Sequence, residues 1–437
     1  RDFIRRRQVH EDLVADIGER RVGARVGAAV EAIGVGIRRV IHARHQRTEA
    51  PALDDLWQAR LSIEAVGSTE GEDVLTRWQT ALPESVAALE ARMLTQDSAG
   101  EHAAAETTAR RIVAIQPGRG SGELRLFEGL MERDPPAAIA HVGQLLAQAS
   151  EPRSRHYLHG WLGMAQDRAG LASAAVATWT GLRADEAAER LPLWTVGAAP
   201  DSWPDVGTTP VQPAPVALLW GPPGSSVERV AAVLAEGLPA FRADRFGPAP
   251  PQDALQKFAT IAALQAGELA PADVVAQWRA SLPARGVEDG QIVDWLPFWD
   301  NQLLRVLRTL MPDTLLLVPL RDPRDMLLDW LAFGAAASPL AIAAPLAAAN
   351  WLAGVLDQVA TLHEQDLHPH RLLRLDAVIE DATALTTLVG NALGTTLPIT
   401  TGMAYRRFPP GHWRGYAEPL AAAFAVLTPA ARRLGYE

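Results

Sequence analysis

The sequence of 437 residues predicts two regions, an all-helical N-terminal region and a C-terminal α/β domain with a parallel sheet. Residues 50–195 place apolar side chains at three- and four-residue spacing, which is typical of packed helices. Residues 196–212 are rich in proline, glycine and small polar residues and read as a linker. Residues 213–437 alternate short apolar runs with helical patterns. This alternation predicts buried parallel strands connected by helices.

The bulk composition supports a soluble protein with more than one core. The chain is longer than one hydrophobic core usually organises, and its residues are 48% hydrophobic and 21% charged. It contains no cysteine, which excludes disulfides and thiolate chemistry and fits a reducing compartment. We therefore expect a cytoplasmic protein. The net charge of −10 argues against a nucleic-acid partner.

The N-terminal segment, residues 1–49, differs from the rest in charge. Residues 1–47 hold eleven arginines and six acidic residues, with apolar positions at helical spacing. We predict a basic amphipathic helix with a solvated face; docking on a partner or an acidic surface is the alternative. Because the chain starts at Arg1 rather than methionine, we expect it to belong to a longer sequence. Lys257 is the only lysine, so a catalytic lysine is almost unavailable.

One uncharged stretch, Trp330 to Leu356, has the length of a membrane span. Pro339 and Pro345 interrupt it, and alanine supplies most of its apolar character. We predict a pair of buried helices here, with a membrane contact as the alternative.

The helical region contains a segment that resembles a tetratricopeptide (TPR) unit. Tyr157 to Gly170, followed by Ala174 to Trp179, shows the alternation of large and small residues by which such helix hairpins stack. Two looser units precede it, at about residues 89–117 and 122–149. The resemblance implies a surface that binds a protein or peptide. An irregular helical bundle is the alternative.

A glycine-rich turn follows the apolar run 216–220 and precedes a helical pattern. It contains Gly221, Gly224, Ser225 and Ser226. A strand, a tight turn and a helix start together present main-chain N–H groups to a phosphate or sulfate. The turn lacks the Gly-Lys-Ser/Thr ending of a Walker A motif, and a purely structural loop is the alternative.

Two further motifs follow in order. The apolar run 314–320 leads into Arg321-Asp-Pro-Arg-Asp325, and Arg406-Arg407-Phe408-Pro-Pro-Gly-His-Trp413-Arg lies near the C-terminus. With the first turn, they resemble sulfotransferases that use 3'-phosphoadenosine 5'-phosphosulfate (PAPS). The resemblance covers about 220 residues and implies that Arg321, Arg406 and Arg407 hold the 3'-phosphate and that Gly221, Gly224, Ser225 and Ser226 form the other phosphate-binding turn. An Arg–Asp network that caps a helix is the alternative for the second motif.

The chain departs from that family at charged and hydroxyl positions. Gly224 stands where the family has arginine, Val227 and Glu228 where it has threonines, and Asp329 where it has a phosphate-binding serine. The lysine that many members carry falls at about Trp295. These losses favour a protein-interaction scaffold with a degenerate donor site. The alternative is an active enzyme that transfers a sulfuryl group from PAPS to a hydroxyl of a protein, peptide or glycan.

Few side chains are placed to act as a catalytic base or a metal ligand. Asp244 is the acidic residue in the region where the family has its base, and it is the candidate base; a surface carboxylate is the alternative. His363, His368 and His370 lie near two acidic residues, but they lack a standard metal-ligand spacing. We therefore expect no metal, and PAPS as cofactor only if the protein is active.

Overall fold

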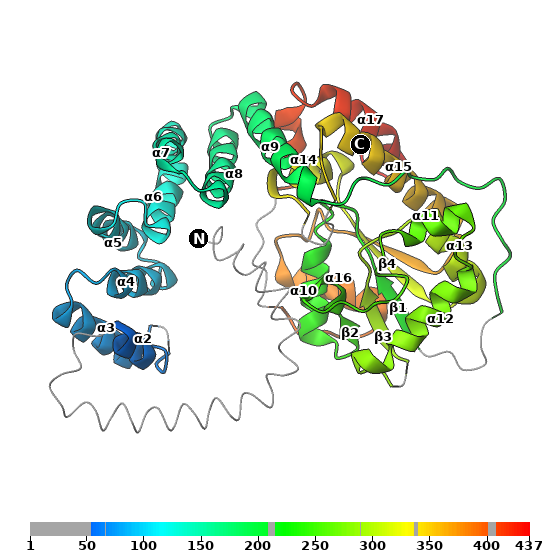
Figure 1. Cartoon of the computed structure of the whole chain (residues 1–437), viewed down its shortest axis with the longest axis horizontal. Coiled ribbons are helices and arrows are strands. Elements are labelled where there is room, and N and C mark those ends of the chain that lie inside the picture. Colours follow the sequence, from blue (N-terminus) through cyan, green and yellow to red (C-terminus); the bar gives the residue numbers. More distant parts are fainter. Residues whose placement is uncertain (1–53, 66, 209–214, 289, 336–339, 401–407) are drawn as a thin grey trace. The chain divides into compact units, whose positions relative to one another are not determined.

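The computed structural model describes residues 54–65, 67–208, 215–288, 290–335, 340–400 and 408–437 (Figure 1). The predicted basic segment, residues 1–49, lies outside these residues. The chain divides into two compact units, and the boundary falls between Ala169 and Gly170. The first unit is all-helical over its described residues, and the second contains a parallel sheet, so the predicted fold class is confirmed.

The described part of the first unit consists of consecutive helices with short connections. Ser68 and Ser85 begin two of them by accepting hydrogen bonds from the main-chain N–H groups of Gly71 and Ala88. The helices are α2 (Asp54–Leu61), α3 (Thr69–Ala81), α4 (Val86–Ala99), α5 (His102–Ile115), α6 (Gly120–Arg133), α7 (Pro135–Gln148) and α8 (Pro152–Arg168). The predicted pairs at residues 89–117 and 122–149 fall on α4–α5 and α6–α7.

Small buried side chains let these helices approach closely. Ala105 and Ala109 of α5 pack against Leu89 and Met93 of α4. Trp161, within the TPR-like segment, stacks on Phe127 of α6 with ring centroids 5.1 Å apart. The unit therefore builds its core from helix-to-helix contacts, as the large and small residue pattern predicts.

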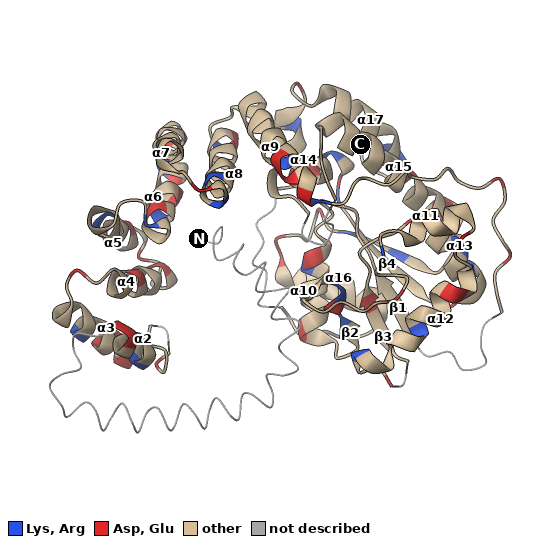
Figure 2. Ribbon diagram, in the orientation of Figure 1, with Lys and Arg blue, Asp and Glu red and all other residues tan. Residues whose placement is uncertain are grey.

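Basic and acidic residues are interspersed along these helices (Figure 2). Glu106 of α5 accepts hydrogen bonds from Arg133 of α6 at 2.6 and 2.8 Å and also pairs with Arg110. The hydrogen bonds from Arg133 lower the pKa of Glu106 against the opposing effect of burial. Part of the surface charge of this unit is thus neutralised between neighbouring helices.

The second unit is built on a five-stranded sheet. Every pairing is parallel, and the strand order is β2-β3-β1-β4-β5. The strands are β1 (Val216–Leu219), β2 (Phe241–Arg242), β3 (Ile292–Trp295), β4 (Leu315–Leu320) and β5 (His370–Arg374). The apolar runs predicted at 216–220 and 314–320 are β1 and β4, which lie side by side at the centre.

Helices cover both faces of this sheet (Figure 1). On one face α10 and α16 pack against Leu219, Leu317 and Leu373. On the other, Leu218 of β1 meets apolar residues of α12 and α13. The helices are α9 (Ala172–Glu186), α10 (Val227–Gly237), α11 (Thr260–Ala266), α12 (Pro271–Ser281), α13 (Asn301–Leu310), α14 (Pro323–Phe333), α15 (Pro345–Glu364), α16 (Ala382–Leu393) and α17 (Ala421–Arg433).

The uncharged stretch 330–356 spans the end of α14 and the first part of α15. The described residues of α14 are mostly buried, and Trp330 of α14 packs on Trp351 of α15 with centroids 5.6 Å apart. In the described part of the chain, no helix has both the length and the apolar character needed to cross a bilayer.

Two segments near the predicted linker pack within the second unit. Trp179 of α9 is fully buried, with its ring 5.7 Å from that of Phe408 and 5.8 Å from that of Tyr416. Residues 196–208 form neither helix nor strand. Arg308 of α13 holds this segment, since its Nε donates to the carbonyl of Pro204 at 2.6 Å and its own carbonyl accepts from the main-chain N–H of Gly207.

Candidate functional site

The two predicted turns lie next to each other because β1 and β4 are adjacent and parallel. The carboxyl ends of neighbouring parallel strands meet at one edge of a sheet, the usual place of a ligand in this architecture. The turns are in close contact. A Cβ atom at Gly224 would lie 2.0 Å from the carbonyl oxygen of Met326, in the first turns of α14. No side chain fits at Gly224 without moving this main chain.

The backbone of the first turn is sharply bent. Gly224 has φ +77° and Ser226 has φ +63°, both in the left-handed region. Gly221 is also required, because a Cβ there would lie 2.5 Å from the Ser225 hydroxyl. The turn leads directly into α10, whose first residue is Val227. Strand, bent turn and helix therefore occur in the predicted order.

The hydroxyls of this turn have no partner. Ser225 is 0% exposed and Ser226 is 1% exposed, and neither Oγ finds a hydrogen bond among the described residues. Leaving a buried hydroxyl unpaired costs about 1–3 kcal/mol. These two hydroxyls, at the positive end of the α10 dipole, are suited to an anion or to ordered water.

The charged side chains of the second turn pair with other groups of the chain. Arg321 is fully buried and pairs through Nη1 with the carboxylate of Asp329, while its Nη2 donates to the carbonyl of Phe408 at 2.6 Å. The second carboxylate oxygen of Asp329 accepts from the main-chain N–H of Phe408 at 3.1 Å. Arg321 and Asp329 therefore bind the carbonyl and the N–H of Phe408, respectively.

The next residues of the same motif hold the C-terminal turn. The two carboxylate oxygens of Asp325 accept from the main-chain N–H groups of Gly411 at 2.6 Å and Trp413 at 2.8 Å. Burial raises the pKa of Asp325 to about 6 against these two hydrogen bonds. Arg324 pairs with Asp322, which caps α14, and its guanidinium lies 3.8 Å from the ring centroid of Trp413. The motif thus joins the turn after β4 to residues 408–413.

The remaining predicted donor-binding residues are Arg406 and Arg407. They lie outside the described residues.

Asp244, the candidate base, lies in the short helix η2 (Asp244–Phe246) after β2. Its carboxylate forms a two-point pair with Arg285, with N–O distances of 2.9 and 2.8 Å. Arg285 also binds Asp294, which binds Arg245 in turn. Burial opposes ionisation of Asp294, but Arg245 and Arg285 outweigh it and hold the pKa well below its usual range. Both oxygens of Asp244 are thus engaged in an ion-pair network.

The histidine cluster forms a hydrogen-bonded chain. Nδ1 of His363 lies 2.9 Å from Nε2 of His370, whose Nδ1 lies 2.7 Å from the carbonyl oxygen of His368. Burial lowers the pKa of His368 to about 4. Over the residues that the structure describes, no group of three or more potential ligands is placed to hold a metal ion.

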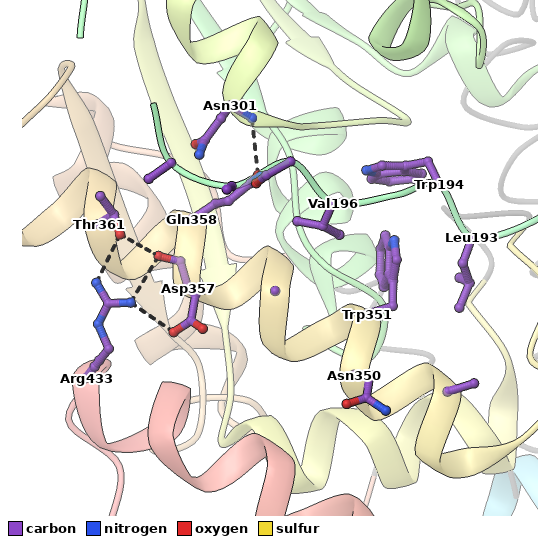
Figure 3. A pocket seen from close by; sticks show the side chains of 15 residues that line it. Leu193, Trp194, Val196, Asn301, Asn350, Trp351, Asp357, Gln358, Thr361 and Arg433 are labelled. Carbon is purple, nitrogen blue, oxygen red and sulfur yellow. Dashed lines mark hydrogen bonds and ion pairs between the residues drawn. The ribbon is translucent and has the colours of Figure 1, made fainter. Parts of the chain in front are cut away.

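A groove that the sequence analysis does not predict lies elsewhere in the second unit (Figure 3). It has a volume of about 700 Å³ and is lined by residues 193–199, by α15 and by Asn301. Its residues are spread over more than 200 positions of the chain, so no local motif marks them. The only feature of the sequence that hints at such a groove is the high number of tryptophans, thirteen in the chain.

Comparison of the sequence with models of protein families finds no match, and comparison with curated proteins finds none either. Comparison with solved structures finds a mutant O-GlcNAc transferase of Thermobaculum terrenum, at 14% sequence identity and a TM-score of 0.32. The match covers 83% of this chain and 75% of that chain. A TM-score of this size does not establish a common fold.

Proposed function

We propose that this chain is a TPR-like protein with a sulfotransferase-type second unit that has lost its donor site and serves as a protein-interaction scaffold. The observation that carries the proposal is the buried pair of Arg321 and Asp329, which closes on the main chain of Phe408. In the resemblance to sulfotransferases, Arg321 aligns with the arginine that contacts the 3'-phosphate, and Asp329 with a serine that binds it.

The Asp329 carboxylate takes the place that the phosphate would have. It is an anion in contact with the guanidinium of Arg321 and with the N–H of Phe408, two donors of the kind that hold a phosphate. A phosphate brought to Arg321 would have to displace this carboxylate and would meet its negative charge. The internal ion pair therefore competes with the nucleotide.

Two further positions support the loss of the donor site. Gly224, which aligns with the family's arginine, lies so close to Met326 that no side chain fits. Trp295, which aligns with the family's lysine, is 4% exposed and packs on Phe246 with centroids 4.2 Å apart. Each missing charge-assisted hydrogen bond removes about 1.5–3 kcal/mol of donor binding. The binding role passes, in this proposal, to the TPR-like helices of residues 54–168, with a protein or peptide as partner.

One observation favours the alternative, an active sulfotransferase. The unpaired buried hydroxyls of Ser225 and Ser226 at the start of α10 are suited to an anion, and in the family this turn binds a phosphate of the donor. Asp244 stays a predicted base under this alternative, and it would have to leave Arg285 to accept a proton.

The test is calorimetric titration of the full chain with 3'-phosphoadenosine 5'-phosphate, the desulfated product of PAPS. We expect no binding at about 1 mM, the concentration at which a binding free energy of about −4 kcal/mol is half-saturating. We expect Asp329→Ser, which restores the family residue, to bind the nucleotide measurably.

Binding by the unaltered chain with a micromolar Kd would overturn the proposal if it is lost in the paired variant Arg321→Met with Asp329→Leu. The paired variant removes both charges together, so it leaves no single buried charge to unfold the protein. Circular dichroism of the variant serves as the folding control.

A further inference from the structure

The groove of the second unit has two unlike walls (Figure 3). One wall is the segment Leu193–Ala199, which forms neither helix nor strand, and the other is helix α15. The walls approach closely at one point, where a Cβ at Gly354 would lie 3.3 Å from the side chain of Val196. No residue of the turns after β1 and β4 lines the groove. It is therefore a separate site.

An unsatisfied amide lies at the groove. Asn301 is 2% exposed, and neither its Nδ2 nor its Oδ1 has a hydrogen-bond partner in the described part of the chain. Its neighbour Gln358 is fully engaged by comparison, since its Oε1 accepts from the main-chain N–H of Asn301 and its Nε2 donates to Asp300 and Gly197. A buried amide without partners is rare. It is matched by a group that offers both an acceptor and a donor.

Two indoles form the apolar end of the groove. Trp194 and Trp351 meet edge to face with centroids 4.7 Å apart. Both Nε1 atoms are buried without a hydrogen-bond partner among the described residues. Together with Asn301, the groove holds three unpaired donor groups and one unpaired acceptor. Carbonyl oxygens would satisfy the donors.

The segment Leu193–Ala199 leaves main-chain groups unpaired among the described residues. Gly197 is bonded, with its carbonyl accepting from Gln358 and its N–H donating to Asp300. Trp194, Thr195, Val196, Ala198 and Ala199 have no main-chain hydrogen bond to any described residue. Main-chain N–H and C=O groups without partners are the groups with which another peptide chain can form hydrogen bonds.

The far end of the groove is polar. Arg433 of α17 donates to the carboxylate of Asp357 at 2.9 Å and to the hydroxyl of Thr361 at 3.0 Å. Between this end and the tryptophans the wall consists of small apolar residues, among them Val196, Ala198 and Ala347. The groove therefore runs from an aromatic end, past a buried amide, to an ion pair.

We propose that this groove binds an extended peptide segment of another protein. Peptide groups supply the carbonyl and N–H that Asn301 lacks and that the main chain of residues 194–199 can pair with, and a large apolar side chain can pack against the two tryptophans at the aromatic end. A sugar ring would stack on an indole, but it would leave the free main-chain edge unused and would face mostly apolar walls. The proposal does not depend on the donor site being lost.

The test is selection of peptides from a random display library on the purified full chain, with Ala347→Trp as the counter-target. Ala347 is exposed, so a tryptophan there blocks the groove without entering the core. We expect enriched peptides to bind the unaltered chain and to lose about tenfold or more in affinity with Asn301→Leu and with Trp351→Ala. Asn391→Leu, at an exposed position of α16, is the matched control and should bind normally.

Thermal unfolding separates loss of binding from loss of folding. Asn301→Leu removes an unpaired buried amide, so its unfolding midpoint should stay the same or rise while peptide affinity falls. A photo-crosslinkable form of the best peptide should label residues 193–199 or 345–361.

Three results would overturn this proposal. One is that no peptide is enriched over the counter-target. The second is labelling within residues 54–168, which would leave the scaffold function standing and remove only the groove. The third is that a glycan array, and not the peptides, gives binding that depends on Asn301.

Discussion

The turns after β1 and β4 both contain motifs that the sequence analysis singles out, but the hydrogen bonding of their polar side chains differs. In the first turn, the hydroxyls of Ser225 and Ser226 are buried and unpaired. In the second, Arg321, Arg324 and Asp325 all interact with residues of the C-terminal turn. A motif can therefore persist because it binds a ligand or because it holds the fold together, and only the contacts distinguish the two cases.

The largest expected effect on the free energy of unfolding comes from the buried pair of Arg321 and Asp329. Asp329→Ala leaves the charge of Arg321 uncompensated and should lower the free energy of unfolding by about 3–5 kcal/mol. The paired variant Arg321→Met with Asp329→Leu should lose much less, because neither member of the pair is left buried without the other. Urea unfolding of the unaltered chain and both variants measures the difference. A loss below about 1 kcal/mol in Asp329→Ala would show that the pair does not hold the C-terminal turn.

The next effect is a pH dependence from Asp325. Its pKa of about 6 in the folded protein exceeds the value of about 3.9 in an unfolded chain. As pH rises, the unfolded chain loses this proton near pH 4, whereas the folded protein keeps it until about pH 6. The stabilisation of the folded protein by this group is therefore complete below pH 4 and is lost as pH passes 6. The free energy of unfolding should fall by about 3 kcal/mol over this range from this group.

A matched variant isolates that contribution. His368 acts in the opposite direction over the same range, because its pKa of about 4 in the folded protein lies below the unfolded value of about 6.5. The quantity to measure is therefore the difference between the unaltered chain and Asp325→Asn, which keeps an acceptor but does not titrate. Parallel stability profiles for the two proteins between pH 4 and 7 would contradict the assignment.

The smallest expected effect on the free energy of unfolding comes from Ser226 in the first turn. Ser226 has φ +63°, and relief of this strain by Ser226→Gly should raise the free energy of unfolding by about 1 kcal/mol. Ser226→Ala removes the same hydroxyl but keeps the strain, so it separates the backbone effect from that of the hydroxyl. If alanine stabilises as much as glycine, the unpaired hydroxyl and not the backbone is the source.

The fold class could be predicted from the sequence because it depends on local patterns. The apolar runs that become β1 and β4, and the helical spacing of residues 50–195, are periodic over short distances. The turns after β1 and β4 also lie where the sequence predicts them, each between a strand and a helix. Their bonding could not be predicted, because Arg321 and Asp325 also bond to main-chain groups of the C-terminal turn, about 87 residues away in the sequence.

Asp329 shows the limit most clearly. In the resemblance to sulfotransferases this carboxylate stands where that family has a phosphate-binding serine, so a phosphate could bind here only if the carboxylate were neutralised. The sequence does not show that Arg321, the residue expected to bind that phosphate, is the neutralising partner. The groove at Asn301 could not be predicted either, since its walls come from segments that meet only after the sheet and its helices have assembled.

Trp179 has a practical consequence for dividing the protein into fragments. The sequence groups it with the TPR-like helices, yet its ring packs on Phe408 and Tyr416 inside the second unit. A fragment that starts after the proline-rich segment would lose this ring and expose two aromatic side chains beside the C-terminal turn. A fragment that keeps this aromatic cluster whole therefore begins near Gly170, so that α9 is included with the α/β unit.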